Sequence, residues 1–336
     1  MESESTRLLK DCKEIAEADE QLQPEGFDGA DGQVRYRKIE LTDKPWMDAL
    51  FAVEGRASLE YNFTNSFVWR HIYKLRAARL GDRLLMLSDP EKPSFLFPPG
   101  RGPLEPVLEQ MAKDARAAGV PLRFHTVLPE DKAWLEAAYP GRFTFELERD
   151  GADYVYETER LATLKGKKLA AKRNHINRFV ENHPDWRYEP LSAGNIEEAR
   201  RMTLAWCAEA RLRQQTDLNG EYCAVDQALR NFEALRLSGG LIRAGGRAVA
   251  FSIGDPLNQD TFLVHFEKAF AEIQGAYPMI NRQFVLANCA GYAFVNREDD
   301  TGVEGLRRAK LSYGPHHLVE KYAATLEGEV LTPSFA

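Results

Sequence analysis

The chain has 336 residues and a formal net charge of −7 at pH 7, with 44% hydrophobic and 28% charged residues. This composition is typical of a globular protein with room for two domains. The acidic balance excludes a general nucleic-acid coat protein. The sequence has no run of about 18 apolar residues, so no membrane-spanning helix is expected.

The N-terminal segment 1–33 is predicted to form a short helix and an acidic, partly mobile lead-in, without the apolar core of a secretory signal. Four cysteines are scattered along the chain without a C-x-x-C pair, which argues against structural zinc. They are Cys12, Cys207, Cys223 and Cys289. We expect reduced thiols in a cytoplasmic protein, and transient contact with the inner membrane surface stays open.

The first half of the chain reads as a mixed α/β unit. Thr42 and Asp43 are predicted to cap a helix after an alternating strand at 34–41. The aromatic segment 61–69 is expected to pack in the core, with base stacking as the alternative. The other predicted elements are a hairpin over 73–88, strands at 94–97, 121–127, 142–149 and 153–157, and helices that end near 118 and 138.

A basic stretch follows. Residues 161–178 hold six Lys or Arg and no Asp or Glu, so the rest of the chain sums to −13 (−7 − 6). We expect a connecting helix from Lys165 to Arg178 whose lysines at i, i+3 and i+7 share one face. Such a face would bind a phosphate, a carboxylate or the acceptor end of tRNA, unless it is merely solvated and paired with acidic neighbours. The candidate anion-binding residues are Lys165, Lys168, Lys172, Arg173 and Asn174.

The second half repeats the order of elements at an offset near 170 residues, although residue identities differ. It holds predicted strands at 187–191, 241–244, 247–254, 260–267, 292–296 and 317–323, and predicted helices at 195–209, 221–237, 277–288 and 302–311. This repeat predicts two tandem mixed α+β domains, each a mostly antiparallel sheet flanked by helices. We place the N-terminal domain at 34–158, the connecting helix at 159–180 and the C-terminal domain at 181–336.

Several segments make the chain resemble a known family. They are residues 161–168, 172–177, 265–268, 274–277 and 296–313. Together with the order of elements they resemble the C-terminal domain of phosphatidylglycerol lysyltransferase, over about residues 35–325. The resemblance implies two tandem GNAT-like domains, named after the Gcn5-related N-acetyltransferases, in a layout similar to that of the Fem transferases. It also implies transfer of an aminoacyl group from charged tRNA to a lipid head group or another small acceptor.

The resemblance places the site where the fourth strand of the second domain splays from the fifth. Alternation along that strand puts His265 and Glu267 on one face, where either could take a proton from the attacking nucleophile. Lys268 is expected to stabilise a carboxylate or the developing oxyanion, and Arg297 to hold a carboxylate or phosphate bidentately. A strand-end salt bridge and a local ion-pair network are the structural alternatives. Further candidate binding residues are Gln274, Gly275, Asn296 and Lys310.

No metal or cofactor is expected, because transfer from an activated ester requires positioning and a proton acceptor. An acyl-CoA-dependent N-acyltransferase is one alternative, although segment 274–277 lacks the spacing of a pyrophosphate-binding loop and prolines remove donors at 98–99. A second alternative is a tRNA-binding or anion-binding module that keeps the fold without the chemistry. The sequence leaves the oligomeric state open.

Overall fold

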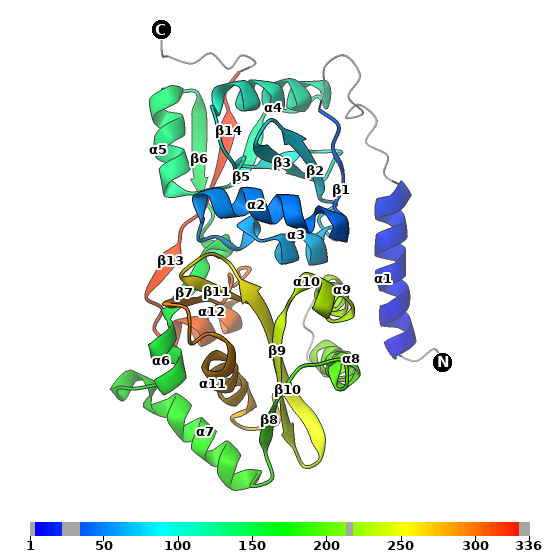
Figure 1. Ribbon diagram of the computed structural model, residues 1–336, viewed down its shortest axis with the longest axis vertical. Helices are drawn as coiled ribbons and strands as arrows, with labels where there is room; N and C mark the ends of the chain where they lie inside the picture. Colours follow the sequence, from blue (N-terminus) through cyan, green and yellow to red (C-terminus); the bar gives the residue numbers. More distant parts are fainter. Residues whose placement is uncertain (1–3, 22–33, 213–217, 329–336) are drawn as a thin grey trace. The chain divides into compact units, whose positions relative to one another are not determined.

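The computed structural model describes residues 4–21, 34–212 and 218–328. They form two compact units (Figure 1). The C-terminal unit comprises Met1–Lys13 and Asp153–Leu318, and the N-terminal unit comprises Glu14–Ala152 and Val319–Ala336. The helix expected near the N-terminus is α1 (Glu4–Gln21), whereas the expected mobile lead-in at 22–33 lies outside the described residues.

The N-terminal unit is built on one sheet in the order β1-β2-β3-β4-β5-β14-β6. Its neighbouring strands are antiparallel except for the parallel pair β4–β5. The strands are β1 (Arg37–Lys38), β2 (Arg76–Leu80), β3 (Arg83–Ser88), β4 (Ser94–Leu96), β5 (Arg123–Val127), β6 (Phe143–Leu147) and β14 (Tyr322–Leu326). The helices are α2 (Lys44–Glu54), α3 (Phe63–Trp69), α4 (Glu105–Ala117) and α5 (Pro129–Ala138).

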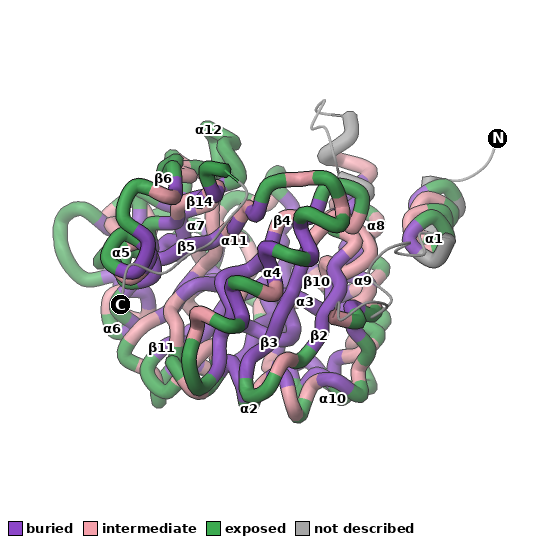
Figure 2. The backbone as a smooth tube through the Cα atoms, turned by 90° about the horizontal axis from the view of Figure 1, so that it is seen from above, coloured by how far each residue is buried: buried purple, intermediate pink, exposed green. Residues whose placement is uncertain are grey.

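The core of this unit lies between the sheet and its helices. Phe95, Phe97 and Phe124 on or beside the central strands are fully buried against Leu108 and Met111 of α4. Figure 2 shows buried residues concentrated along strands such as β3 and exposed residues at loops and outer helices. The aromatic segment 61–69 is largely buried, as its predicted core role requires.

The C-terminal unit carries the second sheet, in the order β13-β7-β12-β11-β10-β9-β8. The strands are β7 (Asp153–Glu157), β8 (Arg187–Pro190), β9 (Ser238–Ala244), β10 (Arg247–Pro256), β11 (Thr261–Ala269), β12 (Phe294–Asn296) and β13 (His317–Val319). The helices are α6 (Thr158–Thr163), α7 (Ala170–Asn182), α8 (Ile196–Leu212), α9 (Leu218–Arg230), α10 (Phe232–Leu235), α11 (Ala276–Asn288) and α12 (Glu304–Leu311).

Helices cover both faces of this sheet. α11 packs on one face together with α6 and α7, and α8 with α9 lies on the other (Figure 1). β11 and β12 form a parallel pair, as β4 and β5 do in the other unit. The predicted architecture is therefore confirmed: two units, each a mixed, mostly antiparallel sheet flanked by helices. Among the described helices none is long and apolar enough to span a bilayer.

The units divide the chain differently from the predicted domains. β7 precedes the predicted boundary at 158, yet it pairs with β12 in the C-terminal unit. The last strand, β14, pairs instead with β5 and β6 in the N-terminal unit. Each sheet thus takes one strand from the other half of the chain, because strand pairing is set by tertiary contacts and not by sequence proximity.

The predicted connecting helix is also interrupted. α6 ends at Thr163, where Leu164 adopts a left-handed conformation with φ 51°, and Gly166 follows with φ 95°. The second helix, α7, begins only at Ala170. Lys165 and Lys168 therefore precede α7, and the expected lysine face on a single helix is wrong.

Candidate functional site

The sheet of the C-terminal unit opens between its two parallel strands. β11 and β12 pair over three residue pairs, from Thr261 with Phe294 to Leu263 with Asn296. β12 ends there, while β11 continues to Ala269. The two strands therefore part after Leu263, which is the splay that the family resemblance implies. Glu267 lies on the continuation of β11, which pairs with β10 but no longer with β12.

Glu267 is held by two partners that come from different elements. Asn281 of α11 donates from Nδ2 to Glu267 Oε2 at 2.8 Å. Arg297, which follows β12, donates from Nη2 to Glu267 Oε1 at 2.8 Å. Both charged side chains are only 11% exposed. Glu267 and Arg297 were predicted from their strand-end positions, and the structure brings them together.

The guanidinium of Arg297 lies against two tyrosine rings. Its Cζ is 4.7 Å from the ring centroid of Tyr313 and 5.6 Å from that of Tyr156. Burial alone would lower the pKa of Arg297, but the charge of Glu267, the neighbouring Tyr156 and Tyr313 and the hydrogen bond to Glu267 together raise it. Arg297 is consequently a permanent buried cation with a fixed orientation.

Three buried polar atoms around Glu267 have no hydrogen-bond partner among the described residues. They are Arg297 Nη1, Asn281 Oδ1 and Ser252 Oγ. Ser252 lies directly opposite Glu267 in the β10–β11 ladder, so the two side chains share a face. Leaving a buried donor or acceptor unpaired costs roughly 1–3 kcal/mol, which favours a bound molecule that supplies the missing partners.

Positive charge exceeds negative charge at this place. Lys172 of α7 is half-buried with Nζ 4.2 Å from the Tyr313 ring centroid, and its pKa is lowered by burial and then by the charge of Arg297. Lys310 is buried, and burial lowers its pKa to about 8. Lys310 donates to the backbone oxygens of Arg297, at 2.7 Å, and Asp299. It therefore anchors the segment after β12 more than it offers a free ammonium group.

His265 occupies a different environment from Glu267. The register of β10 and β11 shifts between Ile253 and Gly254, which leaves His265 as the extra residue of a β-bulge. Its ring nitrogens contact Asp255 at 2.9 Å and Glu298 at 3.0 Å. Asp255 is three positions from Ser252 on β10 and so belongs to the opposite face. The expectation that His265 and Glu267 share a face is therefore wrong.

The charge state of His265 follows from its neighbours. Burial alone would lower its pKa, but the charge of Asp255 and the hydrogen bonds to Asp255 and Glu298 raise it to about 9. At neutral pH the ring is a buried imidazolium between two carboxylates. Both nitrogens are occupied, so the geometry favours a positioning role and leaves Glu267 as the proton acceptor.

Lys268 points away from Glu267. It forms an ion pair with Glu221 of α9, and its Nζ lies 3.9 Å from the Trp206 ring centroid on α8. Trp206 donates in turn to the hydroxyl of Tyr277 at 3.2 Å. The alternation of side chains along β11 explains this division, since consecutive residues face opposite sides of a sheet.

The remaining predicted residues are spread over the unit. Lys165 is exposed and pairs with Glu159 at 3.3 Å, and Lys168 and Asn174 are exposed as well. Arg173 donates to the backbone oxygens of Leu164 and Gly166, and so supports the turn before α7. Asn296 is buried and donates to Asp153 at 2.8 Å.

The turn before α11 is constrained by packing. Gln274 is exposed, and Gly275 has φ 86°. A Cβ at Gly275 would lie 2.2 Å from the backbone oxygen of His175 on α7. Glycine is therefore required there by its left-handed backbone and by the close approach of α7.

Asn281 is the site residue that sequence reasoning missed most clearly. It lies on the buried face of α11 beside apolar Met279, Ile280 and Phe284. A polar residue on an otherwise apolar helical face is the signal that would have identified it. Ser252 had no comparable signal, because only strand pairing reveals that it lies opposite Glu267.

The N-terminal unit lacks an equivalent open place between its parallel strands. The hydroxyl of Tyr61 lies 3.3 Å from the backbone oxygens of Phe97 and Thr126. Phe97 directly follows β4, and Thr126 lies near the end of β5. Tyr61 is 2% exposed. A side chain of the protein itself thus fills the position where those strands diverge, which leaves the C-terminal unit as the candidate site.

Comparisons with known proteins identify the family of the chain. A family model described as "Phosphatidylglycerol lysyltransferase, C-terminal" matches residues 51–325. A crystal structure of a conserved protein of unknown function from Bacteroides thetaiotaomicron is 40% identical, with a TM-score of 0.83, over 87% of this chain and 99% of that chain.

Two more distant structures share the fold. The C-terminal domain of a putative lysylphosphatidylglycerol synthetase from Agrobacterium fabrum is 14% identical with a TM-score of 0.60, over 86% of this chain and 93% of that chain. The structure of L-PGS from Bacillus licheniformis is 18% identical with a TM-score of 0.58, over 85% and 93%. An uncharacterized protein of Mycoplasmoides gallisepticum is 22% identical over 199 residues, 56% of this chain and 60% of that protein's length.

Proposed function

The chain belongs to the phosphatidylglycerol lysyltransferase C-terminal family, a family of acyltransferase type, and from this membership we propose that it transfers an aminoacyl group from charged tRNA to an amine or hydroxyl acceptor. A lipid head group or another small molecule is the proposed acceptor. The observation that carries the proposal is the buried Glu267–Arg297–Asn281 cluster beside the splayed strands, with its three unpartnered polar atoms.

Glu267 is the proposed proton acceptor. The acceptor's nitrogen or oxygen attacks the ester carbonyl and loses its proton to Glu267, and the new bond to the acyl carbon forms. The bond to the ribose oxygen of the tRNA then breaks, and that oxygen takes up the proton. Arg297 Nη1 and Lys172 are placed to stabilise the negative charge on the carbonyl oxygen. We propose Lys172 for this role in place of Lys268, because Lys268 is ion-paired with Glu221.

The basic stretch supports an anionic donor. Four basic side chains on either side of Lys172 are exposed: Lys165, Lys167, Lys168 and Arg178. Exposed basic side chains bind phosphates without reading base sequence. Such contacts suit a tRNA donor that is recognised through its phosphate backbone.

The test is Glu267→Gln, which keeps the shape of the side chain and removes the proton acceptor. We expect turnover to fall by about 10²- to 10⁴-fold while the Kd for charged tRNA stays within about twofold. Glu272→Gln, at an exposed position just past β11, is the matched control and should change neither quantity. Equal losses in turnover and in donor binding would refute the catalytic role. Binding of CoA instead of charged tRNA would favour the acyl-CoA alternative.

A further inference from the structure

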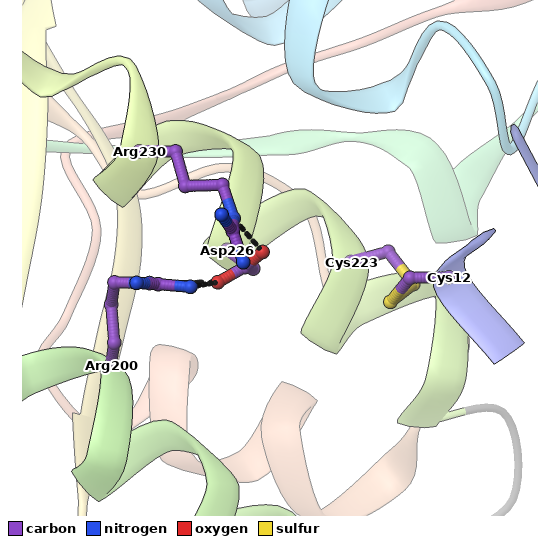
Figure 3. The surroundings of a disulfide bond; sticks show 5 residues. All are labelled: Cys12, Arg200, Cys223, Asp226 and Arg230. Carbon is purple, nitrogen blue, oxygen red and sulfur yellow. Dashed lines mark hydrogen bonds and ion pairs between the residues drawn. A yellow bond between two sulfur atoms is a disulfide. The ribbon is translucent and has the colours of Figure 1, made fainter. Parts of the chain in front are cut away.

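The helix α1 is joined covalently to α9. Cys12 and Cys223 are 211 residues apart in sequence, yet their Cα atoms lie 5.5 Å apart and their sulfurs form a disulfide (Figure 3). Cys207 and Cys289 are buried and are not part of a disulfide. The prediction of four reduced thiols is therefore wrong for Cys12 and Cys223, because the fold brings together two side chains that are remote in sequence.

The helix α1 has a buried non-covalent anchor near its C-terminal end: Asp19 pairs with Arg76 at 2.7 Å and with His71 at 2.9 Å, all within the N-terminal unit. Among the described side chains of this helix, only Leu8 and Asp19 are buried, and Cys12 itself is half-buried. Helices of this length are marginal in water without tertiary packing. The disulfide is the covalent link between the first half of α1, which belongs to the C-terminal unit, and α9. Its second cysteine, Cys223, is 6% exposed.

The helix α9 is also held by ion pairs to β11 and α8. Glu221 pairs with Lys268 of β11. Asp226 accepts hydrogen bonds from Arg200 of α8 at 2.9 Å and from Arg230 at 2.5 Å, as Figure 3 shows. Glu221 and Cys223 are two residues apart and therefore project about 200° apart on the helix. The disulfide holds α9 on the side opposite to β11.

We propose that Cys12 and Cys223 form a reversible thiol–disulfide latch that fixes the first half of α1 on α9 when oxidised and releases that half when reduced, while Asp19 keeps its pairs with Arg76 and His71. Oxidation is an exchange with a small-molecule disulfide: one cysteine thiolate attacks it and releases one small thiol. The second cysteine thiolate then attacks the mixed disulfide and releases the other small thiol. Two protein thiols and one small disulfide thus give one protein disulfide and two small thiols.

The latch has a route to the catalytic cluster. α9 carries both Cys223 and Glu221, and the partner of Glu221 is Lys268, the neighbour of Glu267 in β11. Release of the first half of α1 frees one side of α9 and loosens the Glu221–Lys268 pair. This consequence for catalysis rests on the proposed function, whereas the latch itself does not.

The experiment uses the full chain, treated either with oxidised glutathione or with dithiothreitol and then assayed by peptide mapping and hydrogen exchange. We expect a linked Cys12–Cys223 peptide only after oxidation. Amides of 4–13 and of the first turns of α9 should exchange at least tenfold faster in the reduced protein. The oxidised protein should melt higher, by on the order of 5 °C.

Two variants make the outcome decisive. Cys12→Ser should behave like the reduced wild-type protein under both treatments. Lys10→Ser, a change at an exposed position of the same helix, should keep the full redox response. The proposal is overturned if no linked peptide forms, or if oxidised and reduced wild-type proteins show the same exchange in residues 4–13. These readouts do not depend on turnover, so they remain informative if the proposed aminoacyl transfer fails.

Discussion

At the scale of single residues, the Glu267–Arg297 pair is the central feature of the candidate site. Two buried charges are costly to desolvate, and their attraction offsets this cost only when further hydrogen bonds complete the pair. Asn281 supplies one such bond to Glu267, while Arg297 Nη1 still lacks one. An incomplete buried network is a poor solution for stability alone, which is a physical reason to assign it to substrate binding.

Arg297→Lys tests that assignment. Lysine keeps the positive charge for Glu267 but cannot hold Glu267 and point a second donor at a ligand, because it lacks the forked guanidinium. We expect kcat/KM to fall by roughly 10²-fold, as for loss of one oxyanion donor. Kinetics with charged tRNA would measure the loss in kcat/KM, and chemical denaturation of the same samples would measure the free energy of unfolding.

The matched control is Arg308→Lys, at a side chain that is 74% exposed on α12. It should leave kinetics and stability unchanged. If Arg297→Lys loses stability but keeps wild-type kcat/KM, the pair is structural only, and the proposed role of Nη1 in the reaction is wrong.

Sequence reasoning reached some residues of the site and not others. Glu267 and Arg297 stand at ends of strands whose order was predictable, so their proximity followed from the fold. Asn281 and Ser252 depend on how α11 and β10 lie against β11, and local sequence does not record that packing. The assignment of His265 failed because a single extra residue in β11 turned it to the other face.

At the scale of elements, the bulge in β11 creates a buried charge triad. His265 is 1% exposed at the side chain and lies between Asp255 and Glu298. Glu298 has a left-handed φ of 58°, and its backbone nitrogen donates to Asn296 at 2.8 Å. The imidazolium thus ties β10 to the segment after β12, which carries Arg297. Its protonation should therefore stabilise the splayed region.

The pH dependence of unfolding checks this role. The folded pKa of His265, about 9, is above the ordinary value of 6.5, so its stabilising contribution is complete below pH 6.5 and is lost as pH rises through 9. The full effect is about 3 kcal/mol in the free energy of unfolding. We expect His265→Gln to be less stable than wild type at pH 6, with the difference shrinking by pH 10.

Comparison of the two proteins at each pH removes contributions that they share, such as that of Lys310. The pKa of Lys310 is lowered to about 8, so its effect has the opposite sign: stability is regained as pH rises above 8. A difference between wild type and His265→Gln that stays constant from pH 6 to 10 would show that His265 is not charged in the folded protein.

The order of elements was predictable to a greater extent than their ends. Three features occur where glycine and apolar periodicity indicated them. They are the hairpin turn at Gly81, the turn at Gly245, and the strand β11 followed by the helix α11. The prediction of a single helix across 165–178 was wrong, because a basic sequence with good helix propensity gives no sign that Leu164 will adopt a positive φ.

At the scale of the whole molecule, the exchange of β7 and β14 lay beyond sequence reasoning. Both strands are five residues long and apolar enough to fit either sheet. Only the cross-strand partners, Tyr156 with Val295 and Ala324 with Phe124, decide which sheet each completes. A chain divided at residue 158 would therefore lose one strand from each sheet, which explains why the domains are better described as interleaved in sequence.

The uneven charge of the molecule leads to the last prediction. Four exposed cations between 165 and 178 stand against a chain that sums to −7. If they contact the phosphates of a single-stranded acceptor end, log K against log salt should have a slope of about −3. Lys167→Glu with Lys168→Glu should weaken tRNA binding and roughly halve that slope.

The control is Lys92→Glu with Lys113→Glu, which makes the same change in charge at exposed positions of the N-terminal unit. Long-range electrostatics would weaken binding equally in both double variants, since net charge is what they share. Contact with phosphate would weaken it only in the first, because screening removes the influence of charges more than about 8 Å away at physiological salt. Equal slopes in the two double variants would therefore exclude the basic stretch as the docking surface.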